Sequence, residues 1–221
     1  PQSGSGKTIM TVEPKFVPAD GVVIQLKDSV SLKVRMVDCV GYIVEGALGH
    51  EENGKQRLVS TPWSKDAMTF EEAAEIGTKK VIRDHSTIGV VVITDGSVTG
   101  IERGSYIEAE ERVIDELKSM NKPFVVILNS LTPKDEKTEI LRNELEEKYE
   151  VPILPVNVEQ MEEPDIENIL ETVLYDFPLN EIRINISKWV EGLEKNHWIK
   201  ESIISTLKQC IANLQKIRDI D

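Results

Sequence analysis

Two continuous apolar runs, Gly89–Thr94 (GVVVIT) and Pro123–Leu128 (PFVVIL), restrict this chain to a small set of folds. They are rich in β-branched residues and contain no alternating polar positions, which is typical of strands buried on both faces of a sheet. Residues 105–120 lie between them with the spacing of an amphipathic helix, and Ser105 with Glu108 predicts a capping box at its start. A strand, a helix and a second strand in this order predict a parallel sheet.

The other segments extend this α/β alternation. Residues 22–26 and 32–37 predict a β-hairpin, and a long polar loop is expected over 46–69. Three more helices are expected over 70–86, 135–149 and 166–175, and a long amphipathic helix over 198–220. A further strand is expected over 153–158, and an exposed strand over 180–187.

Composition excludes some classes of protein. The net charge of −13 over 221 residues argues against nucleic acid as a direct partner, because polyanions repel an acidic surface. Cys39 and Cys210 suggest no disulfide framework, and no apolar run is long enough to cross a membrane. The chain begins at Pro1 rather than at a methionine, so we expect it to be a piece of a longer protein.

The letters GSGKT, residues 4–8, resemble a phosphate-binding P-loop, but their context does not fit. The full pattern G-x-x-x-x-G-K-[ST] needs a glycine where this chain has Pro1, and it needs a helix directly afterwards. Pro14 and Pro18 exclude such a helix. Lys7 is therefore predicted to lie in a loop downstream of the true phosphate lysine.

In parallel sheets, ligands bind beyond the carboxyl ends of the strands, so the residues that follow strands are candidate site residues. Asp38-Cys39-Val40-Gly41 is a D-x-x-G sequence after a strand. Its aspartate can hold a metal-bound water, and the N–H of its glycine can approach a γ-phosphate; an Asp-capped turn is the alternative. Thr11 and Thr8 precede the hairpin, where switch GTPases carry a magnesium-binding threonine, although their spacing alone favours two ordinary loop threonines.

Asn129 is the candidate nucleotide-contacting residue after the second buried strand. Guanine-specific proteins carry N-K-x-D there, but here Ser130, Leu131 and Thr132 follow, so nothing selects guanine. Asp95 could line the same site or form a turn. Arg103 could reach a phosphate or be an ordinary surface arginine.

The order of switch threonine, hairpin, D-x-x-G and alternating strands and helices matches a P-loop switch domain from its switch threonine onward. The first strand, the P-loop and the first helix are then expected before Pro1, so the chain alone is expected to be inactive as an ATPase. We expect an incomplete P-loop NTPase-like domain over 1–178, and a C-terminal strand and amphipathic helix over 179–221 that lead to an absent middle domain.

Several strings closely resemble the ATPase domain of the stage IV sporulation protein A family: GKTIMTVEPKFVP, VRMVDCVGY, TPW, FEEAAEIGTKKVI, DHSTIGVVVITDG, YIEAEERVIDELK and KNHWIKES. This resemblance implies a three-layer P-loop NTPase fold of the translation-factor GTPase-like class, truncated at its N-terminus. It implies that Asp38 and Thr11 are catalytic and hold Mg²⁺, Asp38 through water. The second threonine of the family is replaced by Val12, which leaves no paired threonine.

The resemblance also implies an activity and a place in the cell. The family consists of spore coat morphogenetic ATPases, which hydrolyse ATP and polymerise into the basement layer of the coat. Expected partners are further copies of the protein, other coat morphogenetic proteins and a small forespore-membrane anchor protein, with membrane contact through regions absent here. The expected location is the mother-cell cytoplasm at the outer forespore surface. A ribosome-assembly-type GTPase and a non-catalytic scaffold with a vestigial NTPase fold are the alternatives.

Overall fold

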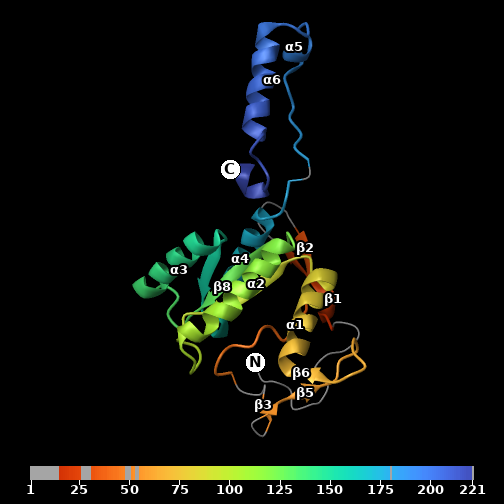
Figure 1. Cartoon of the computed structure of the whole chain (residues 1–221). Helices are drawn as coiled ribbons and strands as arrows, with labels where there is room; N and C mark the ends of the chain where they lie inside the picture. The colour runs from red at the N-terminus through yellow and green to blue at the C-terminus, as the bar shows by residue number, and fades with distance from the viewer. Residues whose placement is uncertain (1–14, 26–30, 48–50, 53–54, 180, 221) are drawn as a thin grey trace. The chain divides into compact units, whose positions relative to one another are not determined.

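The structure is a computed structural model that describes residues 15–25, 31–47, 51–52, 55–179 and 181–220 (Figure 1). The chain divides into two compact units, Pro1–Glu171 and Thr172–Asp221, and each is treated separately below.

The larger unit is mixed α/β and contains a three-stranded parallel sheet in the order β7-β8-β9. Its strands are β7 (Gly89–Thr94), β8 (Phe124–Asn129) and β9 (Ile153–Val156), joined by helices α2 (Ile107–Ser119) and α3 (Glu136–Tyr149). The register pairs Val91 with Val126 and Ile127 with Leu154. The parallel sheet predicted from the two apolar runs is therefore confirmed.

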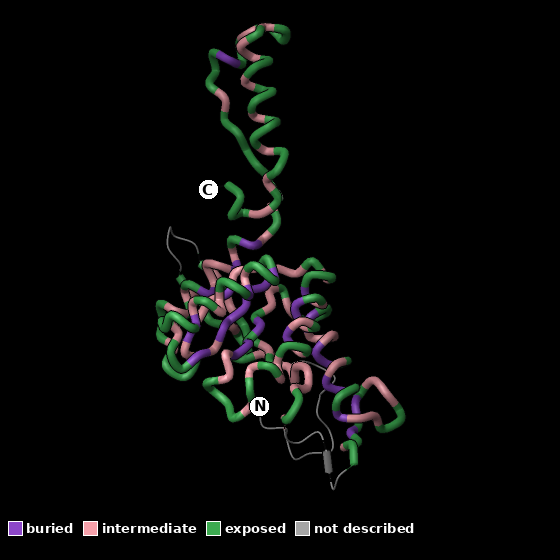
Figure 2. The backbone as a smooth tube through the Cα atoms, turned by 60° about the vertical axis from the view of Figure 1, so that its left-hand side comes forward, coloured by how far each residue is buried: buried purple, intermediate pink, exposed green. Residues whose placement is uncertain are grey.

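The main core lies between one face of this sheet and helices α2 and α3. Ile114 and Leu117 of α2 are almost completely buried against alternate residues of β7 and β8, and Leu145 of α3 joins them. Figure 2 shows this buried centre as purple segments running through the strands. All residues of β8 except the last are buried, which explains its uninterrupted apolar sequence.

Strand β7 differs from β8 because one of its faces is exposed. Val91 and Ile93 point into the core, whereas Val90 and Val92 are 51% and 58% exposed. Among the described residues, β7 pairs with β8 alone, so its other edge carries unpaired backbone groups. An apolar run that was predicted to be buried on both faces is thus covered on only one.

A hairpin and a further helix complete the larger unit. Strands β1 (Val17–Gln25) and β2 (Ser31–Met36) pair antiparallel, as predicted. Helix α1 (Phe70–Lys80) continues into a π-helical turn over Val81–His85. The predicted polar loop over 46–69 instead contains four two-residue strands: β3 (Glu51–Glu52), β4 (Lys55–Gln56), β5 (Leu58–Val59) and β6 (Met68–Thr69).

The expected capping box at Ser105 was wrong, and a capping box forms at α1 instead. The Thr69 hydroxyl accepts the N–H of Glu72 at 3.2 Å, and the Glu72 carboxylate accepts the N–H of Thr69 at 3.1 Å. Helix α2 has no side-chain cap, because the chain enters it through a 3₁₀ turn over Arg103–Tyr106. That turn places Tyr106, rather than Ser105, at the cap position.

The C-terminal unit corrects two further expectations. The exposed strand expected over 180–187 is absent from described residues 181–187, where no second strand lies to pair with it. The long helix expected to reach residue 220 is α6 (Trp198–Ile211), which is followed by a separate 3₁₀ turn over Ile217–Ile220. Helix α4 (Glu163–Tyr175) runs across the boundary between the units, and α5 (Lys188–Glu191) is a single turn.

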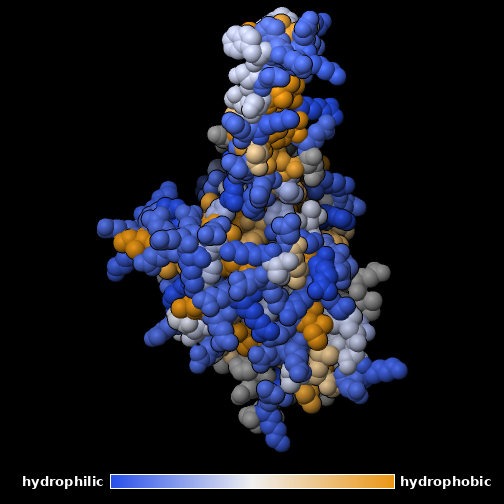
Figure 3. Space-filling view, turned by 45° about the horizontal axis from the view of Figure 1, so that its top comes forward, coloured by the Kyte–Doolittle hydropathy of each residue, from blue (hydrophilic) through white to orange (hydrophobic). Residues whose placement is uncertain are grey.

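The face of the molecule drawn in Figure 3 is mostly hydrophilic, with apolar side chains at several places on it. In the C-terminal unit, Trp189 and Trp198 are 63% and 73% exposed. Within the part of the chain that the structure describes, no helix is both long and apolar enough to cross a membrane.

Candidate functional site

The D-x-x-G sequence forms a turn directly after β2. Asp38 is exposed, and among the described residues its carboxylate accepts no hydrogen bond and pairs with no cation. Gly41 has φ +78°, a backbone conformation that costs other residues about 1–2 kcal/mol. Apart from its chain neighbours, no atom of the described residues lies within 4 Å of where a Cβ would stand on Gly41, so the position favours glycine for its backbone angle and not for lack of space.

The N–H of Gly41 already has a partner in this structure. It donates to the hydroxyl of Thr78 on α1 at 3.0 Å, and Thr78 is only 2% exposed. Burial raises the pKa of the neighbouring Cys39 thiol, although hydrogen bonds from Thr78 and from the Gly41 backbone oppose this rise. The turn is therefore anchored to α1 by a buried side chain.

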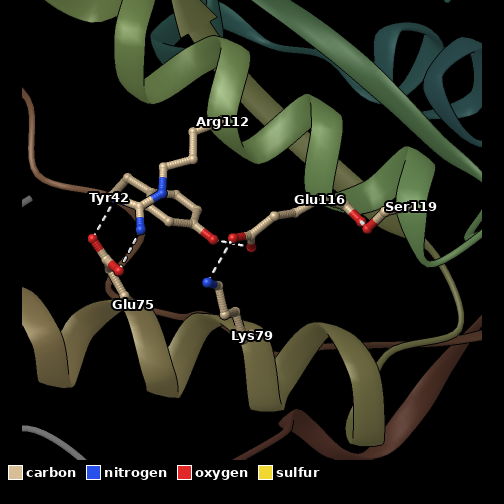
Figure 4. A network of polar contacts seen from close by, with 6 residues as sticks. All are labelled: Tyr42, Glu75, Lys79, Arg112, Glu116 and Ser119. Atoms are coloured by element: carbon tan, nitrogen blue, oxygen red, sulfur yellow. Dashed lines mark hydrogen bonds and ion pairs between the residues drawn. The ribbon is translucent and has the colours of Figure 1, made fainter.

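Tyr42, the next residue, anchors the same turn to α2. Its hydroxyl donates to the carboxylate of Glu116, and the Arg112 guanidinium lies 5.0 Å from the centre of its ring (Figure 4). Burial, followed by the bond to Glu116, raises the pKa of Tyr42 far above its usual range. Tyr42 therefore remains a protonated hydrogen-bond donor at physiological pH.

A second group of polar residues lies at the carboxyl ends of β7 and β8. The carboxylate of Asp95 accepts the N–H and the hydroxyl of Ser97 at 2.9 and 2.5 Å. The Ser97 hydroxyl accepts the N–H of Leu131, which follows β8. Gly96, between Asp95 and Ser97, has φ +91°, and an added Cβ would stand 3.1 Å from the backbone nitrogen of Arg103. The Asp95 turn is thus closely packed and internally hydrogen-bonded.

Asn129 ends β8 and helps to join it to the segment after β9. Its side-chain oxygen accepts the N–H of Val158 at 3.1 Å, and its backbone pairs with Thr94. Asn157 extends this link, because its side-chain amide donates to the carbonyl oxygen of Leu131. The amide oxygen of Asn129 therefore has a structural partner, and any contact with a base would come from its NH₂ group.

Only some of the predicted site residues are among those that the structure describes. Asp38, Gly41 and Asn129 are described, whereas Thr8 and Thr11 lie outside the described residues. Arg103 donates to the buried carboxylate of Glu110 at 2.7 Å, so in this structure its guanidinium is held inside the domain.

The Asp38 carboxylate, exposed and without a partner among the described residues, and the positive-φ Gly41 three residues later provide oxygen and N–H groups of the kind that bind magnesium and phosphate. In this respect the residues present fit a nucleotide with its metal. Among the described residues there is no cluster of three or more His, Cys, Asp or Glu side chains that could hold a metal by themselves. Any metal held here would therefore need ligands from the nucleotide, from water or from other parts of the protein.

Sequence reasoning missed Thr78 and Tyr42, the two anchors of the turn. Thr78 lies 37 residues from its partner Gly41, and Tyr42 lies 74 residues from its partner Glu116. No short sequence motif indicates contacts between residues so far apart. The one available signal was the position of Tyr42 immediately after the D-x-x-G glycine.

Comparison with known proteins places the chain in a family. The family model described as "Stage IV sporulation protein A, ATPase domain" matches residues 1–178, and the one for the middle domain of the same protein matches residues 179–221. Three relatives with the name stage IV sporulation protein A align with all 221 residues of the chain. They come from Clostridioides difficile (78% identical), Bacillus subtilis (48%) and Bacillus anthracis (45%).

The chain spans 45% of the length of each of these relatives. The alignment nevertheless covers the whole chain at high identity, and the ATPase-domain match covers most of it. The chain therefore belongs to the stage IV sporulation protein A family.

Proposed function

We propose that the intact protein hydrolyses ATP and uses this hydrolysis to drive its own polymerisation into the basement layer of the spore coat. The observation that carries the proposal is the D-x-x-G turn after β2, with an exposed Asp38 and a Gly41 at φ +78°. Its occurrence in a domain that matches a sporulation ATPase family supports a nucleotide-dependent role.

The bare side of β7 supports a P-loop fold of the translation-factor GTPase-like class. Val90 and Val92 leave an apolar strip exposed beside an edge of unpaired backbone groups, within the described residues. A parallel strand followed by a helix would pair with that edge and cover that strip. A P-loop strand and its helix, contributed by chain that precedes Pro1, have the required form.

In this proposal Asp38 orients a water of the magnesium shell, and Thr11 and Thr8 lie on the phosphate side. When bound, magnesium neutralises negative charge on the phosphates. In the nucleotide-bound protein the N–H of Gly41 meets the terminal phosphate, and Asn129 lies toward the base. The absence of N-K-x-D after Asn129 favours ATP over GTP.

The assembled state follows from the family resemblance and is part of the proposal. The protein acts in the mother-cell cytoplasm at the outer forespore surface, where copies of it polymerise. Other coat morphogenetic proteins and a small membrane-anchor protein are its partners there, and regions outside this chain contact the membrane.

Phosphate release by the full-length protein, measured with ATP and with GTP, tests the activity. Asp38→Asn should slow ATP turnover by about 100- to 1,000-fold, the scale for losing one electrostatic stabiliser of a transition state. Asp84→Asn is the matched control, because Asp84 is an exposed aspartate in the turn after α1. Unchanged turnover in Asp38→Asn would contradict the site, and preferred turnover of GTP would contradict the nucleotide assignment.

A further inference from the structure

Two consecutive residues, Gly41 and Tyr42, are held by two different helices. The N–H of Gly41 donates to Thr78 on α1, and the hydroxyl of Tyr42 donates to Glu116 on α2. These contacts fix the backbone at the end of the D-x-x-G turn. One of them uses the N–H of Gly41, the group that is proposed to meet a phosphate.

The two helices are also joined to each other around Tyr42. Arg112 of α2 pairs with Glu75 of α1, and Lys79 of α1 pairs with Glu116 of α2 at 2.9 Å. Figure 4 shows the Tyr42 ring between these pairs, with its hydroxyl and the Lys79 ammonium both directed at Glu116. Thr78 immediately precedes Lys79 in α1, so the residue that holds Gly41 is next in sequence to one that links α1 to α2.

The Gly41–Thr78 hydrogen bond competes with phosphate binding. A backbone N–H has one proton and makes one well-aligned hydrogen bond, so it cannot serve both Thr78 and a phosphate oxygen at full strength. At 3.0 Å the bond to Thr78 has ordinary geometry, and the hydroxyl is buried. The N–H of Gly41 must therefore give up or weaken its bond to Thr78 when it binds a phosphate.

We infer that Thr78 is a positioning residue that withholds the N–H of Gly41 from the nucleotide, with Tyr42 as a second anchor that keeps the turn against α2. This inference rests on the proposed ATP site, and neither residue needs to touch the nucleotide. Binding of the terminal phosphate releases the turn from α1, and the contact between α1 and α2 opposes that release.

The direction in which one substitution changes nucleotide affinity separates this role from a merely structural one. Thr78→Val keeps the side-chain shape but removes the hydroxyl acceptor, so until phosphate arrives the N–H of Gly41 keeps only its contact with the Cys39 thiol, which is a weak acceptor. The affinity of the full-length protein for a non-hydrolysable ATP analogue with magnesium should then rise about two- to tenfold, the scale of one net hydrogen bond. A purely structural threonine would give unchanged or weaker binding when replaced.

Thr78→Ser is the matched control, because it keeps the hydroxyl and should retain wild-type affinity. A second measurement needs no nucleotide: amide hydrogen exchange of Gly41 in the free full-length protein should be faster in Thr78→Val than in Thr78→Ser. Tyr42→Phe, which keeps the ring over Arg112 but loses the bond to Glu116, should also tighten binding. It carries the test if Thr78→Val lowers the melting temperature so far that the protein does not fold.

The outcomes distinguish this inference from the proposed function. Absence of ATP binding in the wild-type protein would contradict both. Normal ATP binding by wild type, with no tightening in either Thr78→Val or Tyr42→Phe, would overturn only the role of Thr78. Tighter binding together with faster exchange at Gly41 would support it.

Discussion

The hydroxyl of Tyr149 donates a 2.7 Å hydrogen bond to the carboxylate of Glu110 inside the core of the larger unit. Both residues are 4% exposed. Arg103 donates to the same carboxylate oxygen at 2.7 Å, while Nη1 of Arg103 and the second oxygen of Glu110 are buried without a partner in the described structure. A buried charge is thus stabilised by one cation and one hydroxyl, and it depends on both.

Glu110→Ala should therefore be strongly destabilising. It leaves the Arg103 guanidinium, 19% exposed, without its counter-ion and the Tyr149 hydroxyl without its acceptor. Breaking a buried pair from one side costs about 3–5 kcal/mol of unfolding free energy. Urea denaturation of the chain, followed by Trp63 fluorescence in a Trp189→Phe, Trp198→Phe background, measures this cost in the larger unit.

Tyr149→Phe removes only the hydroxyl and should cost about 1.5–3 kcal/mol, the range for hydrogen bonds to charged groups. Tyr175→Phe is a suitable control, since Tyr175 is 46% exposed, and its effect should be within measurement error. Equal stability of Tyr149→Phe and the wild-type protein would show that the buried charge does not need this donor.

The pH dependence of stability should carry a contribution from Asp95. Burial raises its pKa, but hydrogen bonds from the side chains of Ser130 and Ser97 and from the backbone of Ser97 outweigh burial, so the pKa lies below its ordinary value. Because the folded pKa is the lower one, the unfolded chain binds more protons as the pH falls. The stabilisation is present above the unfolded pKa of about 3.9 and is lost as the pH falls through the folded value.

Thermal melting of the wild-type chain and of Asp95→Asn from pH 7 to pH 3 measures this contribution. The wild-type protein should melt at the higher temperature near neutral pH, and the difference should shrink below about pH 4. A difference that stays constant over the whole range would show that the carboxylate charge is not involved.

Thr69 should contribute to the stability of α1 through its capping box. Thr69→Ala removes the acceptor for the N–H of Glu72 and should cost about 0.5–2 kcal/mol. Thr69→Ser keeps the acceptor and should cost much less. The Trp63 fluorescence measurement applies here too, because the Lys80 ammonium near the end of α1 lies 5.5 Å from the centre of the Trp63 ring. Similar losses in the alanine and serine variants would rule out the cap as the cause.

The parts of the fold that could be predicted from sequence are those set by local pattern. The runs GVVVIT and PFVVIL became neighbouring parallel strands, as their apolar, β-branched sequences indicated, although only PFVVIL is buried on both faces within the described residues. The capping box was expected at Ser105, although Thr69-Phe-Glu-Glu72 has the same pattern directly before an apolar helix face. The sequence shows a capping-box pattern before each of the two helices, but it does not show how the chain enters each helix, and that decides whether the box forms.

In the C-terminal unit, tertiary contacts end helix α6 earlier than the apolar spacing of the sequence predicted. The apolar spacing continues past Ile211, but the N–H of Ile217 donates to the carbonyl oxygen of Phe177. Asp176 pairs with Lys216 and Arg218 at 2.6 and 3.0 Å. These contacts fix residues 216–218 against the segment after α4, where a continuous helix could not place them. The anchors Thr78 and Tyr42 escaped prediction for the same reason, since their partners are distant in sequence.

The chain alone should bind ATP weakly or not at all, on the proposal that the P-loop lies before Pro1. Without that loop, the main contacts to the β- and γ-phosphates are missing. Titration calorimetry with magnesium and ATP, on this chain and on the full-length protein, measures the difference. A micromolar dissociation constant for the chain alone would instead assign phosphate binding to residues within it, of which Lys7 is the candidate.

The last prediction links the site to assembly. Asp38 is exposed in a turn, so Asp38→Ala creates no core cavity and should leave the melting temperature of the full-length protein nearly unchanged. Turnover should nevertheless fall by orders of magnitude, because the aspartate acts on the phosphate chemistry and not on the fold. Thr11→Ala should behave in the same way if Thr11 senses the terminal phosphate.

If hydrolysis selects the shape that polymerises, both variants should also fail to form stable filaments, since an equilibrium shifts only when the two states differ in their interactions with the nucleotide. Phosphate release and sedimentation of polymer, measured on the same samples, test this link, with Asp84→Asn as the control for surface charge. Slow turnover with normal filaments would keep the site but break the link. Slow turnover with lost filaments and an unchanged melting temperature would place assembly downstream of hydrolysis at Asp38.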